Sequence, residues 1–209
     1  IEKGEFFAFL GVTMGNLSYT PTDSLGYTPL LRACSHGNSR MALALLATGR
    51  SGPGIVGDNG FTALQFACGN YLSEVALALI KTGKSKPGQV DCNGVTALLY
   101  SCSKPELKEV AFALLATGKS KPWQANTDGR TPLITACEHG FSDLALKLIE
   151  TEESNPGQVD HRGNTALFYA LENNMQETAY KLIETGKSNW KQSKKQMCFQ
   201  LLELNTSSR

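Results

Sequence analysis

The feature that most constrains this chain is a nine-residue pattern that returns at a nearly constant interval. The pattern reads GYTPLLRAC, GFTALQFAC, GVTALLYSC, GRTPLITAC and GNTALFYAL in chain order. Its threonine falls at Thr28, Thr62, Thr96, Thr131 and Thr165, at spacings of 34, 34, 35 and 34 residues. A fixed period in this range is typical of a repeat protein, in which each unit is one supersecondary element that stacks on its neighbours.

Each unit predicts a helix, a tight turn, a second helix and a loop. The threonine is a good N-cap, because its hydroxyl can accept a hydrogen bond from the second or third helical N–H. Pro29 and Pro132 follow at the first helical position, where the missing N–H of proline costs nothing. The second helix is indicated by apolar residues at i, i+3 and i+4, as in Ala42, Leu45 and Leu46. The sequence therefore predicts an all-α solenoid of stacked helix-turn-helix units.

A second recurring fragment, TGKSKPGQVD at residues 82–91, contains the Gly-Lys-Ser with which a nucleotide-binding P-loop ends. A P-loop also needs a glycine five residues before its second glycine. Ala78 and Ala113 occupy that place before Gly83 and Gly118. Glycine is also the residue that most often ends a helix in the left-handed conformation. We therefore interpret the fragment as a helix end followed by a loop, and a nucleotide-binding enzyme stays only as a remote alternative.

The units resemble ankyrin repeats, whose pattern is D-x-x-G-x-T-P-L-H-x-A-A. The first unit reads Asp23-x-x-Gly26-x-Thr28-Pro29-Leu30-Leu31-x-Ala33-Cys34, and the resemblance covers about residues 23–187. It implies antiparallel helix pairs whose loops project as a row of β-hairpin fingers. We expect five repeats at 23–56, 57–90, 91–125, 126–159 and 160–190, between a partial N-terminal repeat at 1–22 and a C-terminal capping helix and tail at 191–209. The loop wording also resembles ankyrin families encoded by giant DNA viruses of amoebae.

The chain departs from the family pattern at two places. The histidine that follows T-P-L is replaced in every unit, so its side-chain hydrogen bonding is expected to be lost and packing between units to replace it. The replacing residues are Leu31, Gln65, Leu99, Ile134 and Phe168. The third unit has one extra residue in its helix–helix turn, at SKPELKE, with Pro105 near the usual left-handed position. Proline cannot adopt a positive φ, so we expect this turn to be rebuilt.

The residues that could carry chemistry favour a chain without catalytic, metal or cofactor sites. Cys34, Cys68, Cys102 and Cys137 share one repeat position and form no close pair of the kind that binds zinc, so they are predicted to be buried, reduced thiols. Free thiols indicate a reducing compartment, and we expect an intracellular, cytoplasmic protein, in the host cytoplasm if viral. A net charge of +1 and the absence of a long apolar run predict neither nucleic acid nor membrane as a partner. The chain is expected to be a monomer.

The resemblance implies a non-catalytic scaffold that binds a protein partner through its concave face and finger loops. An architectural spacer within a larger or viral assembly is the alternative. The candidate contact residues vary between units while the scaffold repeats: Tyr27, His36, Phe61, Asn70, Val95, Lys104, Trp123, Arg130, His139 and Arg162.

Two features of the loops leave both a structural and a functional interpretation open. Trp123 stands where the other units have Gly54, Gly88 and Gly157, and it can either pack over a neighbouring loop or anchor a partner. A regular row of lysines can be a solvated stripe or a contact for an acidic partner or phosphate backbone. The row comprises Lys84, Lys86, Lys119, Lys121 and Lys187.

Overall fold

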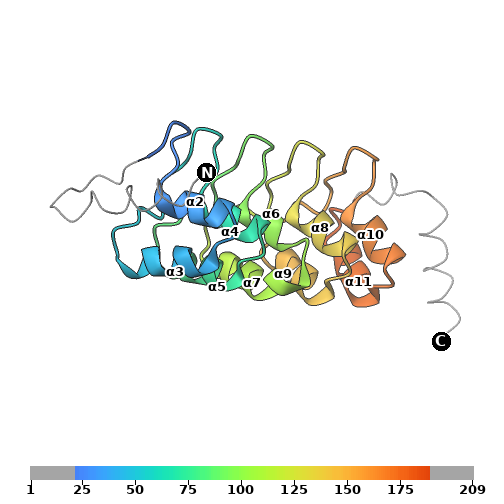
Figure 1. The fold of residues 1–209 in the computed structure, drawn as a ribbon. Helices are drawn as coiled ribbons and strands as arrows, with labels where there is room; N and C mark the ends of the chain where they lie inside the picture. The colour runs from blue at the N-terminus through green and yellow to red at the C-terminus, as the bar shows by residue number, and fades with distance from the viewer. Residues whose placement is uncertain (1–21, 189–209) are drawn as a thin grey trace, which may run out of the picture.

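The computed structural model describes residues 22–188, which form a row of helix pairs (Figure 1). The first helices of the pairs are α2 (Pro29–Ser35), α4 (Ala63–Gly69), α6 (Ala97–Ser101), α8 (Pro132–Glu138) and α10 (Ala166–Glu172). The second helices are α3 (Ser39–Ala47), α5 (Ser73–Lys81), α7 (Lys108–Ala116), α9 (Ser142–Glu150) and α11 (Gln176–Glu184). First helices contact first helices along the row, and second helices contact second helices, so the predicted all-α solenoid is confirmed. The expected N-terminal partial repeat and C-terminal capping helix lie outside the described residues.

The first helices begin at the threonines of the repeated pattern. The hydroxyl oxygen of Thr28 accepts from Leu31 N at 3.2 Å, and that of Thr165 accepts from Phe168 N at 3.3 Å. The three threonines between them cap α4, α6 and α8 in the same way. Four of the five second helices have a glycine at their end, whereas α9 has Glu152 there, with a φ of 58°. Gly83 and Gly118, for example, have φ of 67° and 64°, a conformation that glycine adopts without steric cost.

The core is built from residues that recur once per unit. The leucine two residues after each threonine is almost completely buried, with exposed fractions of 0 to 1%: Leu30, Leu64, Leu98, Leu133 and Leu167. An alanine of each second helix is buried to the same degree: Ala42, Ala76, Ala111, Ala145 and Ala179, with 0 to 2% exposed. These residues belong to one hydrophobic cluster that runs through all five units, so burial is shared along the row.

The four recurring cysteines are buried and unpaired, as the sequence predicts. Burial raises the pKa of the Cys34 and Cys68 thiols to about 12, and the charge of Cys68 adds to the effect at Cys34. A thiol with so high a pKa is protonated at neutral pH and a poor nucleophile. The cysteines therefore act as small apolar side chains. Cys92 is exposed on a loop, and Cys198 lies outside the described residues.

Between the helix pairs the chain forms fingers, which we define as residues 23–27, 57–61, 91–95, 126–130 and 160–164. In each finger the first N–H donates to the carbonyl of the last residue, for example from Asp91 to Val95 at 3.1 Å. Neighbouring fingers are also joined, as where Thr127 N donates to Asn93 O at 3.0 Å. Isolated β-bridges at Val56–Thr62 and Val159–Thr165 flank the second and fifth fingers. The fingers rise as a row above the first helices (Figure 1).

The turn of the third unit is rebuilt, as Pro105 predicts. A short 3-10 helix, η1 (Pro105–Leu107), replaces the left-handed turn residue that the first and fourth units place at Gly37 and Gly140. Leu107, the last residue of η1, is 0% exposed and packs in the core, as Leu72, Phe141 and Met175 do before α5, α9 and α11.

The expected loss of side-chain hydrogen bonding after the T-P-L position is wrong for Gln65. Its Oε1 accepts from the backbone N–H of Thr62 at 2.9 Å, which completes a capping box with the threonine hydroxyl. Its Nε2 donates to the carbonyl of Val95, in the next unit, at 2.8 Å and to that of Gln89, in the loop that leads to it, at 3.2 Å. An amide carries both a donor and an acceptor, so it can cap its own helix and bridge two units at once.

The variant Gln65→Leu is expected to lower the free energy of unfolding by about 1 to 2 kcal/mol, since it leaves the Val95 carbonyl without its donor and breaks the capping box. Leucine fits the space, because Leu31 and Leu99 occupy the same repeat position. Chemical denaturation would measure the change. Gln124→Leu is the matched control, since the Gln124 amide reaches only the neighbouring Ala125 carbonyl. Equal stability of the two variants would contradict the bridging role of Gln65.

Candidate protein-binding surface

The base of four of the fingers is held by one acidic or amide side chain. One Oδ1 atom accepts from the N–H groups two and four residues further on, as Asp160 does from Arg162 N and Asn164 N, both at 2.9 Å. Asp23, Asp91 and Asn126 repeat this arrangement. These bonds fix the loop that carries the exposed fingertip residues, so the fingertips are presented in a defined conformation.

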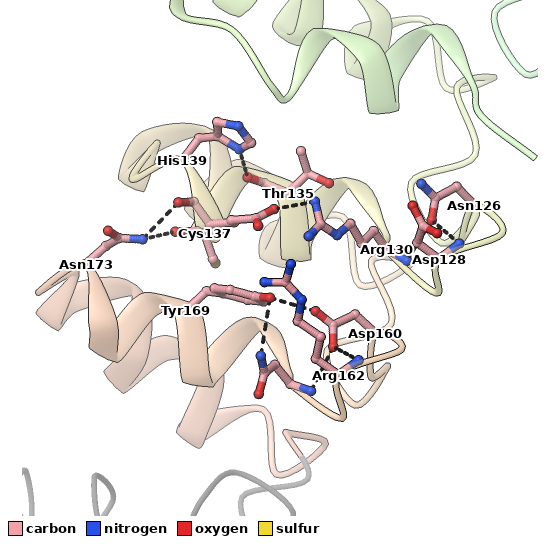
Figure 2. Close-up of polar contacts among 12 residues, drawn as sticks. Asn126, Asp128, Arg130, Thr135, Cys137, His139, Asp160, Arg162, Tyr169 and Asn173 are labelled. Atoms are coloured by element: carbon pink, nitrogen blue, oxygen red, sulfur yellow. Dashed lines mark hydrogen bonds and ion pairs between the residues drawn. The ribbon is translucent and has the colours of Figure 1, made fainter. Parts of the chain in front are cut away.

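In three units the second carboxylate oxygen ties the finger to its first helix. Asp160 Oδ2 accepts from the Tyr169 hydroxyl at 2.7 Å, and Asp91 Oδ2 accepts from the Tyr100 hydroxyl at 2.9 Å. Asp23 Oδ2 accepts from Arg32 Nε at 2.6 Å. Each donor lies nine residues after its acid. Figure 2 shows this clamp in the last unit, with Tyr169 of α10 pointing to Asp160.

The clamp lowers the pKa of Asp160 below its ordinary value of 3.8. Burial acts to raise this pKa, but hydrogen bonds from Tyr169, Asn164 and Arg162 and the charge of Arg130 outweigh it. Burial, together with the same carboxylate, raises the pKa of the Tyr169 hydroxyl. The charged carboxylate therefore stabilises the folded state above pH 3.8, and this contribution is lost as the pH falls through the lower, folded pKa.

We expect Asp160→Asn to lower the free energy of unfolding by about 1.5 kcal/mol at neutral pH, because the Tyr169 hydroxyl loses its charged acceptor. The difference in the free energy of unfolding between the variant and the wild-type protein should become smaller as the pH falls below 3.8, because the wild-type carboxylate also becomes neutral there. Denaturation curves across that range would measure it. Asp128→Asn, at an exposed fingertip, should change little at any pH. A difference in stability that stays constant with pH would contradict the role of a charged Asp160 carboxylate.

The finger positions predicted as contacts differ in how much they expose. Tyr27 is only 7% exposed, since its ring packs edge-on to Phe66 at 5.5 Å and lies under the Arg32 guanidinium at 4.9 Å. Phe61 is half-buried and stacks on the other side of Phe66 at 4.7 Å. Val95 is half-buried too. Tyr27 and Phe61 thus pack on Phe66 of α4, which leaves little of Tyr27 for a partner.

The charged finger residues are more open to solvent. Arg130 forms an ion pair with Glu138 at 2.9 Å, which joins its finger to the end of α8. Arg162 is exposed, and its backbone N–H, rather than its guanidinium, is used in the finger. Figure 2 places both arginines on the same side of the last two units, between the fingers and the first helices.

The position eight residues after each threonine forms a row along the ends of the first helices, which we call the helix-end row. Its members are His36, Asn70, Lys104, His139 and Asn173. The two asparagines bridge to the preceding unit: Asn70 Nδ2 donates to the carbonyls of Cys34 at 2.9 Å and Ser35 at 3.2 Å. Asn173 does the same at Cys137 and Glu138 (Figure 2). The sequence gives no sign that Asn70, a predicted contact, has this structural role.

The other members of the helix-end row are exposed. Nδ1 of His36 and Nδ1 of His139 each lie 2.9 Å from the carbonyl oxygen four residues earlier, and the His139 ring also stacks on Phe141 at 6.0 Å. The Lys104 ammonium lies 5.5 Å from the centre of the Tyr71 ring. Tyr71 is 53% exposed and has a φ of 59°, which is strained for an aromatic residue. Sequence reasoning missed Tyr71, although its place at a turn that has glycine in the first and fourth units is a signal for it.

Trp123 belongs neither to the fingers nor to the helix-end row. It lies in the loop that connects α7 to the fourth finger. Its side chain is 46% exposed. At the equivalent glycines the next loop approaches closely: a Cβ on Gly88 would lie 2.5 Å from the Lys119 carbonyl oxygen. Because Trp123 has a Cβ, the next loop cannot approach it as closely as it approaches Gly54 and Gly88.

Within residues 22–188 no group of His, Cys, Asp and Glu side chains is placed to hold a metal ion. In the same part of the chain, every helix is too short or too polar to cross a membrane.

Comparisons with known proteins agree with the geometry. The family model described as ankyrin repeats (3 copies) matches residues 30–124 and 106–193. Among solved structures, one similar chain comes from the complex of a predatory endopeptidase from Bdellovibrio bacteriovorus with an immunity protein. The TM-score is 0.62 at 28% sequence identity, over 87% of this chain and 92% of that chain. No curated protein gives a significant match, and nothing in these comparisons supports the giant-virus type.

Proposed function

This chain belongs to the ankyrin-repeat family, and from that premise we propose that it is a non-catalytic scaffold that binds a protein partner through its fingers and helix-end row. Ankyrin repeats are general protein–protein interaction modules. The observation that carries the proposal is a regular scaffold whose exposed side chains change from unit to unit. His36, Lys104, His139 and Arg162 are all exposed at positions where the fold requires no particular residue.

The chemistry of these positions suits a protein surface. The Tyr71–Lys104 pair and the open Arg162 combine aromatic and cationic groups, and Tyr and Arg are enriched among the residues that dominate binding energy. The fixed fingers reduce the conformational entropy that binding would cost, because the Asp clamps already hold the loops. The similar chain from Bdellovibrio was solved in a complex of two proteins, which also supports a protein as the partner.

The proposal also places the protein inside the cell, as a monomer. The unpaired cysteines support a reducing, intracellular compartment.

Two other functions make different predictions. An architectural spacer would carry the same varied residues without using them. A nucleotide-binding enzyme would bind ATP with Mg²⁺, and calorimetry with ATP and Mg²⁺ should detect no heat of binding if the scaffold proposal holds.

Affinity enrichment from a lysate of the source cells would test the scaffold proposal. The surface variant combines three changes on the helix-end row, His36→Ala, Lys104→Ala and His139→Ala, with Arg162→Ala on the last finger. The matched control combines Arg40→Ala, Lys81→Ala, Lys147→Ala and Lys181→Ala, which are exposed residues of second helices. The proposal expects a protein that the wild-type chain and the control retain and the surface variant loses. Calorimetry on the purified pair would then measure direct binding. The same proteins on all three baits would favour the spacer.

A further inference from the structure

The connecting loops that follow the second helices carry a set of basic side chains that the proposed surface does not use. These loops span residues 50–54, 84–88 and 119–123 in the first three units. Their charged residues, which we call the basic loop edge, are Arg50, Lys84, Lys86, Lys119 and Lys121. All of them are exposed except Lys121, which is half-exposed.

None of the basic loop edge takes part in an ion pair within residues 22–188. The ion pairs there use other cations, such as Lys108 with Asp143 and Lys147 with Glu150. Five cations without anionic partners on one edge repel one another.

The backbone adds a second reason to look for a function. Lys86 and Lys121 have φ of 52° and 53°, in the left-handed region. The equivalent residues are Gly52 and Asn155, with φ of 61° and 50°, and these two residue types adopt that conformation most readily. A lysine there costs about 1 kcal/mol relative to glycine. The scaffold therefore tolerates lysine at this position in two successive units without being stabilised by it.

The loops also stack in a way that holds the lysine side chains in place. A Cβ on Gly54 would lie 2.3 Å from the Lys84 carbonyl oxygen, so only glycine allows the next loop to approach. At Gly88 the aliphatic part of the Lys121 side chain, from the next loop, lies over the glycine. Cγ and Cε of Lys121 lie 3.3 Å from the Cβ position of Gly88. A stem that rests on the preceding loop loses less side-chain entropy when its ammonium group binds an anion.

Trp123 ends the basic loop edge with an apolar group. It occupies the next position of the Gly54–Gly88 column and is 46% exposed, and within residues 22–188 its ring makes no stacking or cation contact. Beyond it the charge reverses, because the fourth unit has Glu152 and Glu153, both exposed, in the equivalent region. The surface is thus a short row of cations closed by an indole and then by carboxylates.

We propose that the basic loop edge and Trp123 form a second binding surface, for a short acidic segment of a partner protein that also carries an apolar side chain. The carboxylates of Glu152 and Glu153 would repel a nucleic acid or an anionic membrane that continued along the same edge, whereas a short peptide ends before them. A single tryptophan also lacks the series of aromatic side chains on which bases stack. This surface is separate from the fingers and helix-end row, so either can fail while the other holds.

A fluorescein-labelled peptide of glutamates around a central pair of leucines is the probe, and fluorescence anisotropy measures its binding to the full chain. The loop variant combines Lys84→Gln, Lys86→Gln, Lys119→Gln and Lys121→Gln. The control combines Arg40→Gln, Lys108→Gln, Lys147→Gln and Lys181→Gln, which removes the same charge from second helices, outside both proposed surfaces. We expect the loop variant to bind at least about tenfold more weakly than the wild-type chain, and the control to stay within about twofold of it.

Competition separates the possible occupants. Inorganic tripolyphosphate, a thymidine oligonucleotide and phosphatidylserine vesicles are each added to the labelled complex. The proposal holds if the unlabelled peptide displaces the probe at lower concentrations than any of the three. Absence of peptide binding, an equal loss in the control, or tighter binding to the oligonucleotide or the vesicles would overturn it. Circular dichroism of each variant ensures that a loss of binding is not a loss of fold.

Discussion

Leu98→Ala is expected to lower the free energy of unfolding by about 3 kcal/mol, the largest effect of any single change considered. Leu98 is 0% exposed and stands at the centre of the leucine column, with Leu64 before it and Leu133 after it. Truncating a fully buried leucine removes its transfer free energy and leaves a cavity, which together cost about 2 to 5 kcal/mol. In a solenoid the damage also weakens the interfaces on both sides of the changed unit.

Chemical denaturation followed by circular dichroism would measure this effect. Leu25→Ala is the control, because Leu25 is 46% exposed on the first finger and should change stability by less than about 0.5 kcal/mol. Weakening the central unit should also broaden the unfolding transition, since the two ends of the row become less strongly coupled. A Leu98→Ala protein as stable as the Leu25→Ala protein would contradict the shared core.

Trp123→Gly is expected to weaken binding of the acidic probe at least about thirtyfold and to leave the melting temperature nearly unchanged. The binding loss corresponds to about 2 kcal/mol, the cost of truncating an indole that dominates an interface. The fold should tolerate the change, because glycine is the residue of the equivalent loops at Gly54, Gly88 and Gly157. Anisotropy with the labelled peptide and a thermal melt give the two readings.

The opposite pattern would identify Trp123 as a packing residue. In that case the variant would melt at a markedly lower temperature and bind the peptide normally below it. Lys147→Gln, a single change on α9, is the control for the probe, since Lys147 lies outside both the basic loop edge and the helix-end row and should leave peptide affinity within about twofold.

Local sequence rules predicted most of the scaffold, because its elements are fixed by neighbouring residues. The threonine caps, the glycine that ends α5 and the buried cysteines each depend on an i to i+4 relation or on burial that repeats every unit. The rebuilt turn at Pro105 follows from the restricted φ of proline alone.

Interactions between units were harder to predict, since they join residues that the repeat places far apart in sequence. The Asn70 amide reaches Cys34, and the Gln65 amide reaches Val95, thirty residues or more away. A residue type at one position does not reveal such a partner. This is why Asn70 was predicted as a contact for a partner and Gln65 as a packing residue.

One internal correlation could have revealed the finger clamps. Where the finger begins with aspartate, the residue nine positions later is a donor, as in Asp23–Arg32 and Asp160–Tyr169. Where it begins with Gly57, that residue is Phe66, which has no polar group. Five units in one chain supply enough variation to show this pairing, and it marks the acids as structural rather than as free binding groups.

Site-specific photo-crosslinking would test the central claim, protein binding through the fingers and helix-end row, most directly. A photoreactive phenylalanine analogue replaces one exposed residue at a time in cells that produce the chain. The test positions are Lys104, His139 and Arg162, and the comparison positions are Arg40 and Lys147 on second helices. The account predicts a protein adduct of one size from the test positions and none from the comparison positions. Adducts from the second-helix positions alone, or from no position, would contradict it.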